Sequence, residues 1–303
     1  MRKVKTSSIL FFLVPGFLVY CYMFIIPTIE AFYISLLDWN GFRAERIFVG
    51  LRNFVRLTRD DVFFIALGNT FLLMFIGALV AFAVVLLLTF LLTRGGGLRG
   101  RSFFTNLFYF PNMISMAAYG VMWIFIFNPT FGLINNITGL FGIEPIAWLG
   151  VRSTAIASII FASTIPAVGF YLILMMAGVD KIPNTFREAA VVDGASDLTI
   201  FFKITLPLMR DIIVIMCSLW IINGMRNFDF IWALTNGGPA NATQTLGTYL
   251  YGFATGMTAG VGGATLGSIE LGYATAIAMV VFACSVILVG LLRKGFDRES
   301  LQY

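Results

Sequence analysis

Residues 180–207 read DKIPNTFREAAVVDGASDLTIFFKITLP, and this segment separates two long apolar runs of the chain. It is too long to be a tight turn between them. Pro183 is suited to the start of a short helix, and Gly194 can adopt the left-handed backbone conformation that ends or bends a helix. Ser196 can cap a second short helix, and Pro207 suits the start of the apolar run that follows. The segment therefore predicts a helix–glycine–helix unit.

The two predicted short helices carry apolar side chains that a connecting loop would leave exposed. The side chains concerned are those of Ala189, Ala190, Val192, Ala195 and Phe202. An exposed apolar surface indicates contact with a partner protein. It is also compatible with an amphipathic helix that lies on a lipid surface. The residues alone leave both interpretations open.

Apolar runs on both sides of this segment are long enough to cross a membrane, which takes about 20 residues. Five charge-free stretches of this length are clear candidates: residues 6–29, 62–93, 102–143, 153–179 and 271–292. The uncharged stretch 230–269 is also long enough, but it is too rich in Gly and Thr for an ordinary lipid-facing span. The second half of 102–143 is rich in loop-forming residues, so that stretch predicts one span. A sixth helix is expected from Leu206 to Ala233, where the apolar character continues past isolated charges. The chain is therefore predicted to be an all-α polytopic membrane protein with six transmembrane helices.

The composition agrees with a membrane protein and excludes several kinds of chemistry. The chain is 59% hydrophobic and 12% charged, whereas a soluble domain carries about 25% charged residues. It has no histidine, which removes His-ligated metal sites and His-based catalytic sites. Cys21, Cys217 and Cys284 each lie in an apolar run and have no metal-binding or disulfide spacing. We therefore expect no catalytic residues, no metal site and no binding of nucleic acid.

The distribution of Lys and Arg predicts how the chain is oriented. Of the 20 basic residues, 13 fall on the side that holds both termini, and 7 fall on the other side. The positive-inside rule therefore places both termini in the cytoplasm. The first apolar run is too long for a signal peptide and is expected to remain as a span. Residues 230–268 would be external, with short or re-entrant pieces that protein or water must shield.

Three elements of residues 180–207 have the spacing of a known signature: Glu188-Ala189-Ala190, then Gly194, then Ile204-Thr205-Leu206-Pro207. They resemble the EAA loop of the membrane subunits, or permeases, of ATP-binding-cassette (ABC) importers. Further similarities are GLRNFVRL at 50–57, NPTFGLINN at 128–136, AWLG at 147–150, TNGGPANAT at 235–243 and GYATAIAMV at 272–280. Together they resemble the carbohydrate importers of the maltose and glycerol-3-phosphate type. The run SLLDWNGF at 35–42 is similar to the first of the two permeases in such systems.

The resemblance implies a type I ABC importer transmembrane-domain fold. Residues 1–303 would form a single permease domain, and residues 179–206 would be its cytoplasmic coupling loop. The implied partners are a second homologous permease, two cytoplasmic ATPase subunits and an external solute-binding protein. The complex would lie in the lipid of a bacterial or archaeal cytoplasmic membrane.

The resemblance also implies that ATP is hydrolysed by the partner subunits and not by this chain. ATP and Mg²⁺ would be bound there, so no cofactor is expected on this chain. The sequence agrees, because it contains no G-x-x-x-x-G-K-[ST] phosphate-binding loop. Contact with the ATPase is implied for a set of loop residues: Glu188, Ala189, Ala190, Asp193, Gly194, Leu206 and Pro207.

A substrate pathway is expected on the helices that flank the loop, because polar groups inside spans are costly and often line a pathway. Trp220, Asn223 and Asn227 recur at helical spacing and would share one face. An aromatic ring and amides suit a neutral sugar. The resemblance to maltose-type permeases adds Ser163 and Phe170, which match sugar-contact positions. Such residues also hold helices together, so packing is the alternative interpretation.

Two further alternatives concern charge. Arg226 and Asp229 favour a mutual ion pair over a site for a charged substrate. The alternative function is an ion-coupled secondary transporter of a small polar solute. Such a transporter normally has an acidic residue near the middle of a span, and none of the predicted spans carries one there.

Overall fold

The computed structural model describes residues 6–260 and 263–296, and most of them are helical. The chain divides into two compact units. The first unit runs to Asp60 and also contains Leu250–Thr258 and Thr265–Phe282. The second unit contains Asp61–Tyr249, Ala259–Ala264 and the chain from Ala283 onward. The single domain expected over residues 1–303 stays a prediction, as does the loop boundary at 179–206.

Within the described residues, four helices are long and apolar enough to cross a membrane: Phe11–Ile34, Asp61–Gly96, Arg152–Val179 and Leu271–Phe296. Two further candidates are pairs of helices with a sharp bend between their halves. Arg101–Met113 and Met116–Ile126 are bent by 91°, and Asp197–Leu208 and Arg210–Met225 are bent by 72°. If each bent pair is one span, the number of spans is the predicted six. The basic residues Arg2, Lys3, Lys5 and Arg298, which were counted for the orientation, lie outside the described residues.

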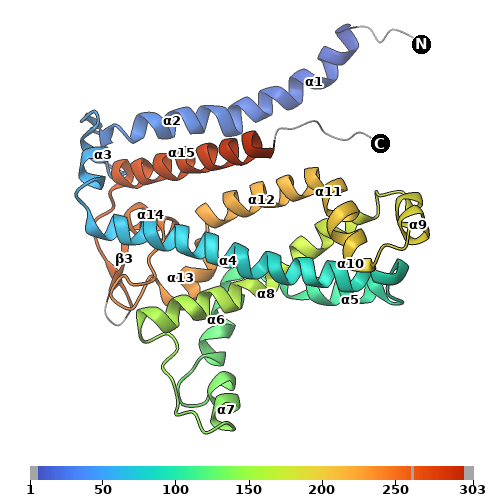
Figure 1. The fold of residues 1–303 in the computed structure, drawn as a ribbon. Helices are drawn as coiled ribbons and strands as arrows, with labels where there is room; N and C mark the ends of the chain where they lie inside the picture. The colour runs from blue at the N-terminus through green and yellow to red at the C-terminus, as the bar shows by residue number, and fades with distance from the viewer. Residues whose placement is uncertain (1–5, 261–262, 297–303) are drawn as a thin grey trace. The chain divides into compact units, whose positions relative to one another are not determined.

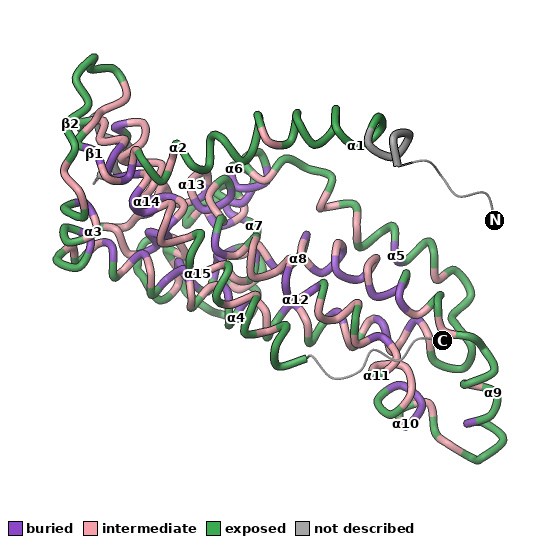
Figure 2. Tube along the Cα trace, turned by 90° about the horizontal axis from the view of Figure 1, so that it is seen from above, coloured by how far each residue is buried: buried purple, intermediate pink, exposed green. Residues whose placement is uncertain are grey.

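The first unit begins with α1 (Thr6–Tyr20), a π-helical stretch (Cys21–Ile25) and α2 (Ile26–Ile34). Figure 2 shows this helical segment exposed along most of its length, and its apolar side chains from Phe11 onward have no buried face. Next come β1 (Leu37–Asp38), which pairs antiparallel with β2 (Ile47–Phe48), and then α3 (Arg52–Leu57). The remaining parts of this unit come from α14 (Leu246–Thr255), β3 (Met257–Gly260), β4 (Gly263–Leu266) and α15 (Leu271–Phe296).

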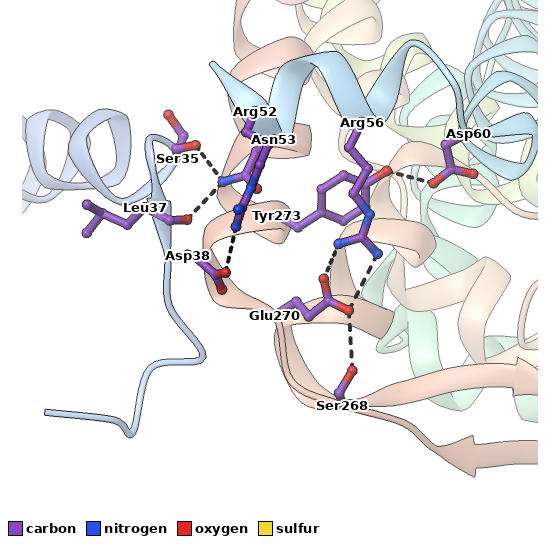
Figure 3. A network of polar contacts seen from close by, with 10 residues as sticks. All are labelled: Ser35, Leu37, Asp38, Arg52, Asn53, Arg56, Asp60, Ser268, Glu270 and Tyr273. Atoms are coloured by element: carbon purple, nitrogen blue, oxygen red, sulfur yellow. Dashed lines mark hydrogen bonds and ion pairs between the residues drawn. The ribbon is translucent and has the colours of Figure 1, made fainter. Parts of the chain in front are cut away.

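A polar network ties α3 to the start of α15 inside the first unit (Figure 3). Arg56 pairs with Glu270, and its guanidinium lies 4.0 Å from the ring centroid of Tyr273. The Tyr273 hydroxyl donates a 2.6 Å hydrogen bond to Asp60. The buried amide of Asn53 donates to the carbonyls of Ser35 and Leu37, both at 2.9 Å. Segments more than 200 residues apart in sequence are therefore joined by side-chain contacts.

The second unit holds most of the helices. They are α4 (Asp61–Thr93), α5 (Arg101–Tyr109), α6 (Met116–Ile126), α7 (Leu133–Gly139), α8 (Arg152–Val179), α9 (Asn184–Val192), α10 (Asp197–Ile200), α11 (Leu206–Leu208), α12 (Arg210–Met225) and α13 (Asp229–Thr235). Figure 1 shows α4, α8 and α12 running side by side, and all three are in mutual contact. The α8 helix is the most buried of the four long spans.

Small residues explain how closely α8 packs. A side chain at Gly169 would collide with the backbone of Phe108, and one at Gly178 would come within 2.7 Å of Met209. Helices in membranes approach each other closely where such small residues lie at the contact. Pro166, inside α8, has no N–H group, which frees the carbonyl of Ala162. The Tyr119 hydroxyl donates to that carbonyl at 3.1 Å and so compensates for the lost helical bond.

The single helix predicted from Leu206 to Ala233 is wrong. The chain bends at Met209, α12 ends at Met225, and a new helix starts at Asp229. The backbone carbonyl of Asn227 accepts a hydrogen bond from the Thr245 hydroxyl at 3.2 Å, in place of one from a helical N–H group. A tertiary hydrogen bond therefore replaces the helical one, and local composition does not reveal this partner.

The segment after α13 contains irregular backbone that α4 satisfies. Asn69, fully buried in α4, donates to the carbonyls of Ala242 and Gln244 at 2.9 and 2.8 Å. The Thr70 hydroxyl accepts from the backbone N–H of Leu246 at 2.9 Å. Irregular backbone inside a membrane protein needs such shielding. The short pieces expected between residues 230 and 268 are present as α13, α14, β3 and β4.

Candidate functional site

A cavity of about 480 Å³ opens in the second unit between α4, α8 and α12. Its walls include all five residues predicted for the substrate pathway: Ser163, Phe170, Trp220, Asn223 and Asn227. The volume lies in the range of about 300–1,000 Å³ that is usual for small-molecule sites. The tertiary structure therefore brings these five residues together, and their role as a pathway stays a prediction.

Trp220 packs helices together and also lines the cavity. Its indole N–H donates to the backbone carbonyl of Met74 in α4 at 2.8 Å. Its ring lies 5.3 Å from Phe82 and 5.5 Å from Tyr171, centroid to centroid. Gly77 leaves room for it, because a Cβ at Gly77 would lie 3.2 Å from the indole. Trp220 therefore has a packing role, since its N–H group is already occupied, and its role in the substrate pathway stays a prediction.

The two asparagines lie at and beyond the end of α12, and the Asn223 side chain hydrogen-bonds that of Tyr171. Asn223 is exposed in the last turn of α12, and Asn227 is partly exposed beyond the end of that helix. The helical spacing used to place them on one face therefore does not apply to Asn227. Both still line the same cavity, because the chain turns there instead of continuing as a helix.

Two other predicted residues lie on the α8 wall. The Ser163 hydroxyl donates to the carbonyl of Ile160 within the helix at 3.3 Å. The Phe170 ring contacts that of Tyr171 edge-on, with centroids 5.1 Å apart. Phe170 thereby joins the aromatic group around Trp220.

Four uncharged polar residues of the cavity were not predicted: Thr70, Asn112, Tyr171 and Thr245. Asn112 donates to the carbonyl of Pro166 at 3.3 Å. A polar residue inside an apolar run is the signal that could have identified Asn112. Thr70 and Tyr171 offer no such signal, because both types are common at helix contacts.

The predicted ion pair between Arg226 and Asp229 is not formed. Both residues are exposed and line the cavity, and no ion pair between described residues joins them. The cavity wall therefore offers amides, hydroxyls and aromatic faces with one guanidinium and one carboxylate. For the residues whose placement is described, no group of three or more acidic or cysteine side chains could hold a metal ion.

The segment singled out in the sequence does fold as a helix–glycine–helix unit. The α9 helix ends at Val192, and Gly194 has φ = +76°, in the left-handed region. Gly194 N–H donates to Val191, and Ala195 N–H donates to Ala190 at 2.9 Å, which together form a Schellman motif. Ser196 then caps α10 by accepting from the backbone N–H of Thr199.

Most of the predicted ATPase-contact residues are accessible. Glu188, Ala189, Asp193, Gly194 and Pro207 are exposed, and Leu206 is half-buried in α11. The expectation that Ala190 would be exposed is wrong, because only 7% of its surface is accessible. The Schellman motif causes this burial, since it folds the chain after Gly194 back onto the last turn of α9. Val192 is the most exposed apolar residue of the unit, at 87%.

Comparisons with known proteins agree on one family. Residues 91–299 match the family described as binding-protein-dependent transport system inner membrane component. The chain is 34% identical to the probable ABC transporter permease protein YurN of Bacillus subtilis, over 94% of each chain. It is 32% identical to the diacetylchitobiose uptake system permease protein NgcF of Streptomyces coelicolor, over 99% of this chain and 87% of that one. It is 30% identical to the trehalose/maltose transport system permease protein MalF of Thermococcus litoralis, over 98% and 96%.

A solved structure shares the fold. A chain of a bacterial ABC transporter involved in the import of the acidic polysaccharide alginate superposes with a TM-score of 0.80. The match covers 96% of both chains at 20% identity. The same kind of transporter, in complex with an alginate pentasaccharide-bound periplasmic protein, gives a TM-score of 0.80 at 19% identity. At this identity the likeness shows the fold alone, which is that of an ABC importer membrane subunit.

Proposed function

Because the chain belongs to the family of binding-protein-dependent transport system inner membrane components, we propose that it is a permease subunit of an ATP-driven importer of a sugar or oligosaccharide. It forms half of the translocation pathway, and an external solute-binding protein delivers the substrate. One observation carries this function. Two of the helices that line the cavity, α8 and α12, are the helices that the exposed helix–glycine–helix unit connects.

The substrate class follows from the relatives and from the cavity. Relatives at 30% and 32% identity are named for uptake of trehalose or maltose and of diacetylchitobiose. Amides such as Asn112, Asn223 and Asn227 bind sugar hydroxyls, and the aromatic group around Phe170 offers apolar faces. The relatives favour this function over the alternative, an ion-coupled secondary transporter.

The partners follow from the same proposal. The permease pairs with a second, homologous permease, and two cytoplasmic ATPase subunits hydrolyse ATP with Mg²⁺. This chain contributes no catalytic residue and binds no cofactor of its own. The exposed loop residues Glu188 and Ala189 contact the ATPase.

The chain is a multi-pass membrane protein, as its family and its apolar helices show. We propose that both termini lie in the cytoplasm and that the membrane is a bacterial or archaeal cytoplasmic membrane. The exposed apolar surface of α1 and α2 suits contact with lipid or with the second permease.

Reconstitution tests the function. The chain is purified with its second permease, its ATPase subunits and its binding protein, and the complex is placed in liposomes. We expect sugar uptake that needs ATP and binding protein, with ATP hydrolysis stimulated by the sugar-loaded binding protein. Uptake that persists without the ATPase subunits and follows an ion gradient would contradict the proposal.

A further inference from the structure

The C-terminal end of α4 is bound to the helix–glycine–helix unit by one carboxylate. Asp197, in the first turn of α10, accepts a hydrogen bond from the backbone N–H of Gly95, just beyond α4, at 3.2 Å. The same oxygen, Oδ1, lies 3.7 Å from the guanidinium of Arg187 in α9. Asp197 thus contacts both halves of the unit and the end of a helix that precedes it by about 100 residues.

The turn after α4 consists of glycines, which let Asp197 and Arg187 lie close to its backbone. Gly95, Gly96 and Gly97 have φ values of +63°, +94° and +107°, which L side chains rarely adopt. A Cβ at Gly96 would lie 2.9 Å from the Arg187 guanidinium. The positive φ values therefore favour glycine in this turn, and a Cβ at Gly96 would displace the end of the Arg187 side chain.

An apolar contact accompanies the polar one. The ring of Phe90, in the last turns of α4, lies 5.5 Å from that of Phe201, just after α10. Phe201 is buried. Beside these contacts is a cavity of about 80 Å³ whose wall includes Thr93, Arg187 and Asp197. The polar part of the contact is thus partly open to solvent, while the aromatic part is packed.

The N-terminal half of α4 reaches the substrate cavity, where Thr70, Met74 and Gly77 form part of the wall. A helix rises 1.5 Å per residue, so the turn at Gly95 is about 27 Å from Gly77 along a stiff element. The α8 and α12 helices are joined to the loop through the backbone, whereas α4 meets it through side-chain and backbone contacts. A displacement of the loop can therefore reach the cavity along α4 if the contact at Asp197 holds.

We propose that Asp197 is a positioning residue that couples the loop to α4. This inference rests on the proposed function, in which the ATPase moves the loop. Asp197 holds the Gly95 turn against α9 and α10, so that α4 follows the loop together with α8 and α12. Without this contact, loop movement is transmitted incompletely to the α4 wall of the cavity.

The first test measures sugar transported per ATP hydrolysed, in liposomes that hold the whole complex. Asp197→Ala removes the acceptor, and we expect a ratio lowered by about three- to ten-fold, the effect of one lost hydrogen bond. Basal ATP hydrolysis should remain. Asp197→Asn keeps an oxygen acceptor for Gly95 and should retain most of the ratio. Asp211→Ala is the matched control, because Asp211 is also an exposed carboxylate in the first turn of a helix, α12.

A ratio for Asp197→Ala equal to that of the unaltered complex would overturn the proposal. So would a loss of transport and of basal hydrolysis in the same proportion as the yield of complex, since that indicates a structural role alone. If Asp197→Ala and Asp197→Asn lowered the ratio of sugar transported to ATP hydrolysed equally, the hydrogen bond from Gly95 would not be what couples the loop to α4.

A second measurement does not depend on transport. Spin labels are placed at Leu98 and Val192, both exposed, after the three native cysteines are replaced. In the complex with its ATPase, the label-to-label distance should be narrowly distributed and should broaden in Asp197→Ala. An unchanged distribution of label-to-label distances would show that Asp197 does not hold the Gly95 turn against the loop. If the unaltered complex imports no sugar, the proposed function fails, and this measurement still decides the role of Asp197.

Discussion

At the scale of single residues, the side chains of the cavity divide by whether their polar groups are already used. The indole N–H of Trp220 is bonded to α4, and the Ser163 hydroxyl is bonded within α8. The Asn223 side chain hydrogen-bonds that of Tyr171, whereas the Asn227 side chain lies at the cavity wall beyond the end of α12. Groups already bonded contribute to packing, whereas accessible amides can exchange water for a substrate hydroxyl.

This division predicts different effects of two substitutions. Asn227→Ala should lower uptake a few-fold, to an extent that depends on the sugar, since a hydrogen bond contributes about 0.5–1.5 kcal/mol. Assembly should be unchanged, because the backbone carbonyl that accepts from Thr245 remains. Trp220→Ala should lower the yield of assembled complex as well, because it removes the bond to Met74 and leaves a void between α4 and α12.

Uptake of several sugars and the yield of complex are measured in both variants. A fall in the yield of Asn227→Ala that matches its fall in uptake would assign Asn227 to packing.

Arg56 and Arg52 form a second contrast between single residues. Arg56 pairs with Glu270 and also lies over the Tyr273 ring, whereas Arg52 pairs with Asp38 at the surface, at 2.6 Å. We expect Arg56→Ala to lower the free energy of unfolding by about 1 kcal/mol after solvent screening. Arg52→Ala should change it by less than about 0.5 kcal/mol. Denaturation of the two purified variants in the same detergent compares them, and equal effects would contradict this account of the network.

At the scale of elements, the helix–glycine–helix unit depends on its turn. The Schellman motif at Gly194 fixes the angle between α9 and α10 and buries Ala190. The exposed side chains of Glu188, Ala189 and Val192 are thereby presented on one short, rigid helix. A rigid element of this kind can transmit a displacement, which a flexible loop cannot.

Substitutions at Gly194 test the turn. Gly194→Val puts a β-branched residue at φ = +76°, which costs about 1–3 kcal/mol of strain. We expect the permease to be inserted but the ATPase to dissociate or to lose its stimulation by the loaded binding protein. Gly194→Asn should retain much of the coupling, because asparagine tolerates the left-handed conformation. Retention of the ATPase on the purified permease and stimulated hydrolysis are measured. Equal behaviour of the two variants would show that the turn geometry is not required.

At the scale of the whole molecule, the proposed topology of six spans with cytoplasmic termini would place the helix–glycine–helix unit on the ATPase side. The predicted outer side includes the connection between α7 and α8. Leu140 lies in that connection, is 84% exposed and has φ = −62°, which a cysteine tolerates. Asn241, although in the predicted external segment, has φ = +64° and is less suited to substitution.

Cysteine labelling tests this orientation in a chain whose three native cysteines are replaced. A membrane-impermeant reagent added to intact cells should label Leu140→Cys. Val192→Cys, 87% exposed on the loop, should be labelled only after permeabilisation. The reverse pattern would show that the positive-inside rule fails for this chain.

The fold class and the family were predictable from the sequence, because both depend on local patterns. Charge-free runs locate spans wherever a helix must bury its own backbone groups in lipid. The Pro, Gly and Ser positions of residues 180–207 identify the two short helices and the turn at Gly194, since these residues act through their own backbone preferences. The comparisons confirmed the family, and the structure confirmed the helix–glycine–helix unit.

The tertiary structure alone decided where the helices end and which side chains contact each other. The helix after residue 206 breaks at Arg226–Phe228, where Thr245 bonds the carbonyl of Asn227, and a partner 18 residues away leaves no local signal. The Trp220 indole bonds the backbone carbonyl of Met74, and Ala190 is buried by the chain that follows it. The contact of Asp197 with Gly95 is of the same kind. Local propensity determines which elements form, whereas the end of a helix and the wall of a cavity depend on partners that only the folded chain brings within hydrogen-bonding distance.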